Sequence, residues 1–370
     1  MKTAESIVKT CNEYLNVPSV IGFEEPFFQH LEQKFSKDGL LTESLYNRYG
    51  RRVLMAVSNN GFNYDRPIAA HIDRHGLYKI LDPNLVYFSD THRQKRDVEY
   101  AAHAIKRINF DQDEFSQDHL EKVYNYFLNE QIEVYHPTTH EVLHKRLITD
   151  KDISIIDDYL TCNLSDLNVF NELPFPFLPL AFSANQRRSD PNFIEGQIDN
   201  TLSVAVITEL FKADVSMTVI LTTDEEIGDS WLYMERFFSK NKLTPRNLLV
   251  LDTSPYKEEH GLRQVQDGGA VVLRYADNYA AFNRQMTHKL RLVCQELEIP
   301  YDFKDLTVLK NGGSHLGNTE LGKLIWKSGG LFSGTTLQLP TDEYHTNQEK
   351  TSLASIDNFF KVVKRFMDDQ

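Results

Sequence analysis

Hydrophobic positions near the N-terminus recur at helical spacing. Phe27, Phe28, Leu31 and Phe35 fall on one side of a helix that the pattern predicts over about 24–35. An amphipathic stretch precedes it, and the two are separated by a turn containing Pro18. The chain is therefore expected to begin with two helices that each bury one face.

Short β-rich segments then alternate with helical ones. The predicted strands cover 52–57, 67–72, 216–222, 247–252 and 335–339, and the predicted helices cover 201–212, 231–238, 278–297 and 355–367. Alternation of this kind is typical of an α/β body with parallel strands. We therefore expect a mixed, largely parallel sheet flanked by helices.

Residues 80–190 interrupt this alternation. They are rich in His, Tyr and charged residues and contain scattered β-type segments. We predict a main domain formed by 1–79 and 191–370, with 80–190 inserted as a mainly β second domain. A chain of 370 residues is long enough for this division.

Composition and charge narrow the class of protein. Hydrophobic residues make up 41% and charged residues 25%, which is ordinary for a folded chain. The formal charge of −13 gives no general basic field, so nucleic acid and anionic membrane are not expected partners. The apolar stretch 173–184 contains three prolines and is too short to span a bilayer.

The compartment is inferred from the cysteines and the N-terminus. Cys11, Cys162 and Cys294 form no close pair and have no metal-type spacing. The first residues lack the uninterrupted apolar core of a signal peptide. A reducing, cytoplasmic location is therefore expected.

Metal-capable residues follow three of the predicted strands. The strand at 67–72 contains His71 near its end and is followed by Asp73, Glu225 and Glu226 follow 216–222, and Asp252 ends 247–252. Strand ends in an open α/β sheet converge on one crevice. Two further residues complete the candidate set: Asp199, just before the helix at 201–212, and His345, between the last strand and the last helix.

These residue types suit a two-metal hydrolytic centre. Zinc accepts imidazole nitrogen and carboxylate oxygen, and a carboxylate such as Asp199 can bridge two ions. Asp73 is placed to accept a hydrogen bond from His71 and fix its tautomer. The pair Glu225 and Glu226 can divide two tasks, with one binding metal and the other moving a proton.

Six motifs in this order resemble the tetrahedral aminopeptidase family, a branch of the co-catalytic zinc exopeptidases that includes glutamyl and deblocking aminopeptidases. They are VPSVIGFEEPFFQHL, AAHIDRHGL, GQIDN, TTDEEIG, LDT and EYHTNQE. The resemblance implies that His71, Asp199 and Asp252 surround one metal and that Asp199, Glu226 and His345 surround the other. It also implies that Glu225 is the general base.

The resemblance further implies a metallo-aminopeptidase of the hydrolase class that acts on peptides. Two divalent ions are expected, with zinc as the first choice and cobalt as an alternative. The insertion at 80–190 lies between His71 and Asp199, where this family carries a dimerisation and substrate-access domain. A homo-oligomer is the expected assembly.

Several positions depart from the family pattern. Arg74 and His75 stand where an acidic and an apolar residue are usual, Thr201 stands where Arg is common, and His315 follows Gly312-Gly313-Ser314. Two other functions therefore remain open. One is a di-metal amidohydrolase, either an N-acyl amino acid deacylase or a carboxypeptidase, and the other is a catalytically inactive oligomeric scaffold.

Overall fold

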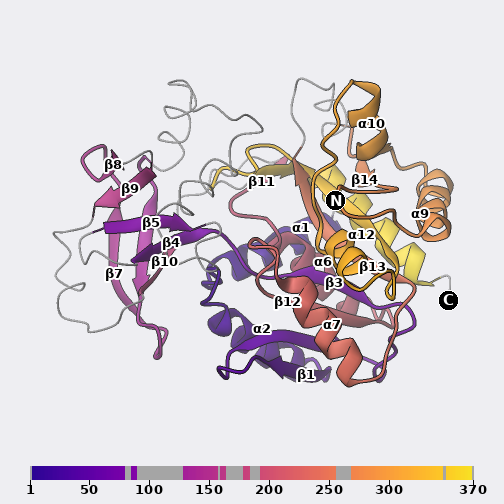
Figure 1. Cartoon of the computed structure of the whole chain (residues 1–370), viewed down its shortest axis with the longest axis horizontal. Helices are drawn as coiled ribbons and strands as arrows, with labels where there is room; N and C mark the ends of the chain where they lie inside the picture. The colour runs from indigo at the N-terminus through magenta and orange to yellow at the C-terminus, as the bar shows by residue number, and fades with distance from the viewer. Residues whose placement is uncertain are drawn as a thin grey trace.

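The computed structural model of the chain describes residues 2–79, 85–89, 128–156, 159–163, 178–183, 192–255, 268–344 and 347–368. Two sheets dominate it (Figure 1). The larger sheet forms the centre of a layered body with helices on both sides. No helix among the described residues is long and apolar enough to cross a membrane.

The larger sheet has eight strands in the order β1-β2-β12-β3-β13-β16-β14-β15. Its middle strands β12, β3, β13 and β16 run parallel to one another, whereas β1, β2 and β14 join by antiparallel pairing. Their bounds are β1 Leu41–Tyr46, β2 Arg52–Ser58, β3 Ile68–His71, β12 Thr218–Thr222, β13 Leu248–Pro255, β14 Val271–Leu273, β15 Tyr301–Phe303 and β16 Gly334–Thr341.

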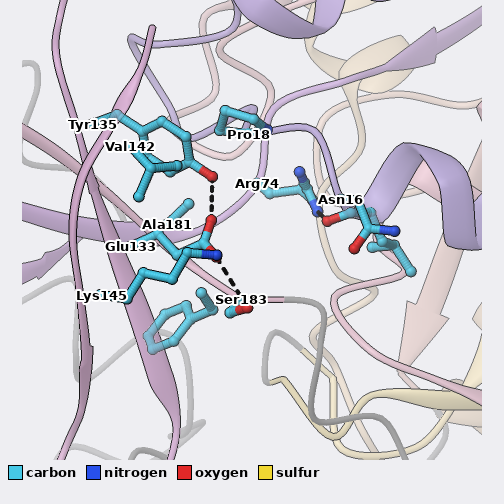
Figure 2. A pocket seen from close by; sticks show the side chains of 11 residues that line it. Asn16, Pro18, Arg74, Glu133, Tyr135, Val142, Lys145, Ala181 and Ser183 are labelled. Carbon is cyan, nitrogen blue, oxygen red and sulfur yellow. Dashed lines mark hydrogen bonds and ion pairs between the residues drawn. The ribbon is translucent and has the colours of Figure 1, made fainter.

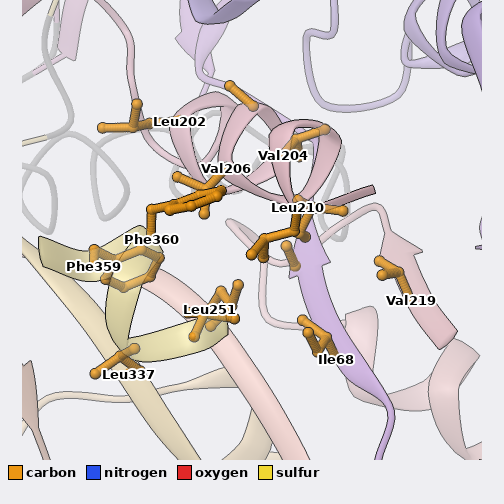
Figure 3. Close-up of a cluster of buried hydrophobic side chains, with 14 of the residues drawn as sticks. Ile68, Leu202, Val204, Val206, Leu210, Val219, Leu251, Leu337, Phe359 and Phe360 are labelled. Carbon is orange, nitrogen blue, oxygen red and sulfur yellow. The ribbon is translucent and has the colours of Figure 1, made fainter. Parts of the chain in front are cut away.

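Both faces of this sheet are buried, which explains its nearly continuous apolar strands. Along β13, Leu249 and Leu251 belong to one hydrophobic cluster, and Leu248 and Val250 belong to another. Figure 3 shows the first cluster, where Leu251 meets side chains from the helices above the sheet. This cluster includes residues of α1 Lys2–Leu15, α2 Glu25–Lys37, α6 Thr201–Lys212, α9 Arg284–Glu296 and α12 Leu353–Asp368.

The opposite face is covered by α7 Ser230–Lys240 and α11 Glu320–Lys327, which pack against each other. A short helix, α10 Lys304–Lys310, follows β15. A two-stranded ribbon pairs β11 Phe193–Glu195 with β17 Lys350–Ser352. This ribbon brings the chain before Asp199 next to the chain after His345.

The second sheet has seven strands in the order β7-β6-β10-β4-β5-β9-β8, and every pair in it is antiparallel. It lies to one side of the layered body (Figure 1). Its strands are β4 Gly76–Lys79, β5 Leu85–Ser89, β6 Gln131–Tyr135, β7 Val142–Leu147, β8 Ile153–Ile156, β9 Tyr159–Asn163 and β10 Leu178–Phe182. The chain therefore enters this sheet at Gly76, directly after the strand that carries His71.

The predicted fold class, a mixed and largely parallel sheet flanked by helices with a separate β unit, is confirmed. The two largest differences from the expected boundaries are at the start of α9 and at the end of β13. Helix α9 begins at Arg284 rather than 278, because the side chain of Asn283 caps it by accepting from the amides of Gln285 and Met286. Strand β13 continues three residues beyond Asp252, since it stays paired with β16 as far as Pro255.

Candidate metal centre

Adjacent parallel strands bring the predicted residues together. Strands β12, β3 and β13 are neighbours, and Thr222 at the end of β12 is in register with His71 at the end of β3. Asp252 lies on β13, on the other side of β3. Asp199 reaches the same place from the segment before α6. The shared edge expected from the sequence is therefore present.

Three distances describe a group that suits a metal ion. The Nε2 atom of His71 lies 3.1 Å from Oδ1 of Asp199 and 3.5 Å from Oδ1 of Asp252. Donor atoms bound at about 2.0–2.2 Å to one tetrahedral ion lie about 3.3–3.6 Å from each other. Ligand atoms of His71, Asp199 and Glu226 also lie within 4.8 Å of one another. The donor set and its spacing fit a divalent cation.

Three carboxylates contact the imidazole of His71. Burial acts to lower its pKa, but Asp199, Asp252 and Asp73 outweigh that effect and hold the pKa well above its ordinary value. Its Nδ1 atom lies 3.4 Å from Oδ1 of Asp73. Because a bound cation needs a neutral imidazole, uptake of metal displaces the proton that these carboxylates attract.

Asp73 also holds the turn that carries the paired glutamates. Its Oδ1 accepts the amide of Glu225 at 3.2 Å, and its Oδ2 accepts the amide of Glu226 at 3.1 Å. One buried carboxylate therefore connects His71 on β3 to the loop after β12. Removal of this carboxylate would release both partners.

The two glutamates have different surroundings. Glu226 Oε2 lies 3.0 Å from Nε2 of His75. The pKa of Glu225 is held well above its ordinary value, first by burial and then by the negative charges of Asp252, Glu226 and Glu320, while His71 acts in the opposite direction. A carboxyl group with a raised pKa among candidate metal ligands has the properties of a proton acceptor.

Asp199 is fixed through its backbone and its neighbour. Its amide donates to Oε2 of Glu349 at 3.0 Å, and Asn200 Nδ2 donates to the carbonyl of Leu251 at 2.8 Å. Leu251 directly precedes Asp252. These two hydrogen bonds hold Asp199 against β13 and beside His71.

His345 lies outside the described residues, and so do residues 80–84 and 90–127 of the predicted inserted domain. His345 therefore stays a prediction for the second ion. The residue before it, Tyr344, is described and lies near the centre: burial raises the pKa of its phenol well above the ordinary value, and Asp199, Asp252 and Glu226 add to this effect.

Arg74 does not face the metal-ligand group. Its Nε donates to Ser19 Oγ at 2.8 Å, and its guanidinium also donates to the carbonyl oxygens of Leu15 and Val17. Leu15 is the last residue of α1, whose terminal carbonyls need such donors. Arg74 thus fastens the N-terminal helix rather than contributing to the chemistry.

Arg74 also borders a pocket of about 340 Å³ between the N-terminal segment and the second sheet (Figure 2). The central carboxylate there, Glu133, accepts from Tyr135, from Lys145 at 2.6 Å and from Ser183 at 3.2 Å. These side chains satisfy one another, and no polar group among those lining the pocket calls for a ligand.

Thr201 and His315, the other residues that depart from the family pattern, also lie outside the group of candidate ligands. Thr201 is fully buried as the first residue of α6. His315 is exposed, and its Nε2 lies 2.9 Å from Nδ2 of Asn278. Neither is within the group formed by His71, Asp199 and Glu226.

Arg274 was missed by the sequence reasoning. It follows β14 and is only 2% exposed, and the described part of the chain offers no hydrogen-bond partner to its Nε and Nη1 atoms. Burial lowers its pKa, whereas Asp277, Asp252 and Tyr344 act to raise it. Buried guanidinium nitrogens without hydrogen-bonded partners are costly, so these two atoms call for a functional explanation.

Two buried glutamates were also missed. Glu349 holds the amide of Asp199, and Glu320 accepts from Thr222 Oγ1 at 2.6 Å. Burial raises the pKa of both carboxyl groups. Only the position of Glu349, close after His345 in the EYHTNQE motif, could have drawn attention to it from the sequence.

Glu24, from the N-terminal motif VPSVIGFEEPFFQHL, helps to stabilise the turn that carries Glu225 and Glu226. Arg51 donates to Asp224, and its Nη1 lies 3.5 Å from Oε2 of the fully buried Glu24. Tyr233 donates to the same Asp224 carboxylate at 2.6 Å. Asp224 has a positive φ of 64°, so these partners hold the backbone in the conformation from which Glu225 and Glu226 project.

Comparison with known proteins agrees with this geometry. Residues 181–362 match the model of the M42 glutamyl aminopeptidase family. This range contains Asp199, both glutamates, Asp252 and His345. No curated protein matches the chain.

Solved structures share the fold over nearly the whole chain. An aminopeptidase from Desulfurococcus kamchatkensis has a TM-score of 0.68 at 13% identity, covering 99% of this chain and 96% of its own. The TET1 peptidase of Pyrococcus horikoshii has a TM-score of 0.63 at 15% identity, covering 97% and 98%.

A Thermotoga maritima protein described as an endoglucanase has a TM-score of 0.59 at 12% identity, covering 97% and 98%. At these identities the likeness concerns the fold, and the family match over residues 181–362 carries the assignment. The match of residues 181–362 to the M42 glutamyl aminopeptidase family, together with the shared fold, confirms the family resemblance predicted from the sequence.

Proposed function

We propose that this protein is a metal-dependent aminopeptidase that removes N-terminal residues from peptides with the help of two divalent ions, zinc in the first instance. The observation that carries the proposal is that Asp199 and Asp252 both lie within 3.5 Å of His71 Nε2 at one sheet edge, with Glu226 beside His71 and Asp199. The family match gives the reaction class.

Each residue would have one task. His71, Asp199 and Asp252 would hold one ion, and Asp199, Glu226 and His345 the other. Bound divalent ions supply Lewis-acid polarisation of the scissile carbonyl and make a nucleophilic water available near neutral pH. Glu225 accepts the proton of the attacking water and returns it to the departing amine. Asp73 keeps His71 and the glutamate turn in place while this happens.

The number of metal ions per chain follows from this assignment of ligands to two sites. Protein purified without chelator and replenished with zinc or cobalt is expected to hold two ions per chain, because Asp199 can bridge while the remaining ligands divide between two sites. Elemental analysis measures this ratio. A saturating value near one would contradict the two-metal arrangement.

Arg274 suggests the preferred substrate. A carboxylate is the natural partner of a guanidinium, which can bind it through two parallel hydrogen bonds. The charge of Arg274 acts on Asp252 and Tyr344, so its guanidinium belongs to the surroundings of the metal centre. We therefore propose that Arg274 binds the acidic side chain of an N-terminal Glu or Asp residue.

Two other functions use the same fold or ligands. A deacylase or carboxypeptidase would hydrolyse N-acyl amino acids or C-terminal residues, so a panel of aminoacyl anilides, N-acyl amino acids and C-terminal peptides separates these from an aminopeptidase. An inactive scaffold would bind metal without hydrolysing any of them. The retained ligands, together with the peripheral positions of Arg74 and Thr201, favour an active enzyme.

The second sheet is proposed to serve assembly. None of the candidate ligands lies within it, and the Pyrococcus horikoshii relative is described as forming a tetrahedron or a large octahedral shell. We therefore propose a homo-oligomer that depends on the predicted 80–190 domain. The cytoplasmic location inferred from the cysteines also stays a prediction.

A deletion tests this role. Replacement of residues 76–183 by a short linker is expected to leave the described ligands in place but to give smaller particles, since the sheet proposed to join subunits is removed. Light scattering on the variant and the full chain measures the difference. An unchanged particle mass would remove the second sheet from the proposed assembly.

A further inference from the structure

His75 makes a contact with the candidate metal centre that its neighbour Arg74 does not. Its side chain is 8% exposed, and its Nε2 lies 3.0 Å from Oε2 of Glu226. At this distance an imidazole can pair with one oxygen of a carboxylate and leave the other oxygen available. His75 thus touches a proposed metal ligand from within AAHIDRHGL, the motif that also carries His71.

The geometry separates a supporting role from direct ligation. The described donors that lie within 4.8 Å of one another are those of His71, Asp199 and Glu226, and His75 is not in that group. Asp252 is also outside this group, but it lies 3.5 Å from Nε2 of His71. The recorded ion-pair contact of His75 is with Glu226, which is the arrangement of a residue that orients a ligand.

The backbone around His75 is fixed on several sides. Gln197 Nε2 donates to the carbonyl of His75 at 3.0 Å. On one side of it, the amide of Arg74 donates to Ser19 O at 2.8 Å, and on the other a Cβ added to Gly76 would lie 2.6 Å from Val20 Cγ1. The imidazole is therefore presented to Glu226 from a segment with little freedom to move.

We propose that His75 is a positioning residue: its imidazole pairs with Oε2 of Glu226, directs the other oxygen to the metal and thereby strengthens the ion site that Glu226 serves. The proposal rests on the two-metal function stated above. It also connects that site to the second sheet, because the next residue, Gly76, begins β4.

The test compares His75→Leu with His75→Gln in the full chain. Cobalt affinity is measured by competition with a chromophoric chelator, and the visible spectrum of bound cobalt is recorded. Mutation of a residue that orients a metal ligand typically costs 10–100-fold in affinity, so His75→Leu is expected to weaken the second cobalt by about 10–100-fold and to leave the first unchanged. His75→Gln restores an N–H at similar reach and is expected to recover most of the loss.

Exposed His288 on α9 provides the matched control, since His288→Leu is expected to leave both affinities and the cobalt spectrum unchanged. Unchanged cobalt affinity in His75→Leu would overturn the proposal. A loss in His75→Gln as large as in His75→Leu would also overturn it, because the imidazole would then bind metal or act by packing alone. If the unmodified protein binds one ion or none, the two-metal function itself fails before any variant is compared.

Discussion

Glu225→Gln is expected to lower kcat by about 10²–10⁴-fold, the usual contribution of a positioned general base, while both metal ions stay bound. The amide of glutamine matches the size of the carboxylate but does not accept a proton. Asp73 holds the Glu225 backbone amide, which the substitution does not alter, so the turn keeps its shape. Steady-state kinetics on an aminoacyl anilide and elemental analysis of the same preparation give the two numbers needed.

Glu226→Gln serves as the contrasting variant. An amide oxygen is an uncharged and poorer ligand, so this change is expected to reduce metal content rather than kcat of the fully loaded enzyme. Glu235→Gln, at a half-buried position on α7 away from the candidate ligands, controls for the substitution itself. Loss of metal in Glu225→Gln with retention in Glu226→Gln would reverse the two roles, and full activity in both would place the chemistry elsewhere.

The main sheet was predictable because each central strand is buried on both faces. Leu248 to Leu251 read as a continuous apolar run, and the structure divides it between two hydrophobic clusters. Helix α6 was predicted with its observed bounds, Thr201–Lys212. The strand β15 and helices α10 and α11 were not, since they are too short for hydrophobic periodicity to reveal them.

The metal-ligand group was predictable for a topological reason. Parallel strands place their carboxyl ends at one edge, so residues following β3, β12 and β13 meet regardless of their separation along the chain. Asp199 is brought in by the ribbon of β11 and β17, which the sequence pattern does not reveal. The order of motifs supplied that position instead.

Side-chain direction was not predictable. Arg74 and His75 are adjacent departures from the family pattern, yet Arg74 turns to the end of α1 and His75 turns to Glu226. Neighbouring residues in extended chain point to opposite sides, but which side faces the centre depends on how the N-terminal segment packs. Only the folded arrangement distinguishes a helix-fastening residue from a metal-site residue.

Arg274 could not be identified as a functional residue from the sequence for the same reason. In the sequence it is one arginine after a short apolar run, and exposure would be the ordinary expectation for it. Antiparallel pairing of β14 with β16 places it in the sheet that carries Asp252, and packing then buries it. Chemistry that depends on burial becomes apparent only after the sheet order is known.

Arg274→Met is expected to lower kcat/KM for a glutamyl anilide by about 10–150-fold, the equivalent of the 1.5–3 kcal/mol of a hydrogen bond to a charged group. Activity on a leucyl anilide is expected to hold or rise, since the apolar methionine suits an apolar side chain. Arg274→Lys keeps the charge but lacks the planar fork, so an intermediate loss is expected.

The readout is the ratio of the two kcat/KM values, because a merely structural defect lowers both alike. Anilide substrates have no C-terminal carboxylate, so a selective loss on the glutamyl anilide assigns Arg274 to the side chain of the N-terminal residue. Loss on dipeptides such as leucylglycine with full activity on the glutamyl anilide would instead assign Arg274 to the peptide's C-terminal carboxylate. An equal fall on both anilides would contradict any role of Arg274 in substrate choice.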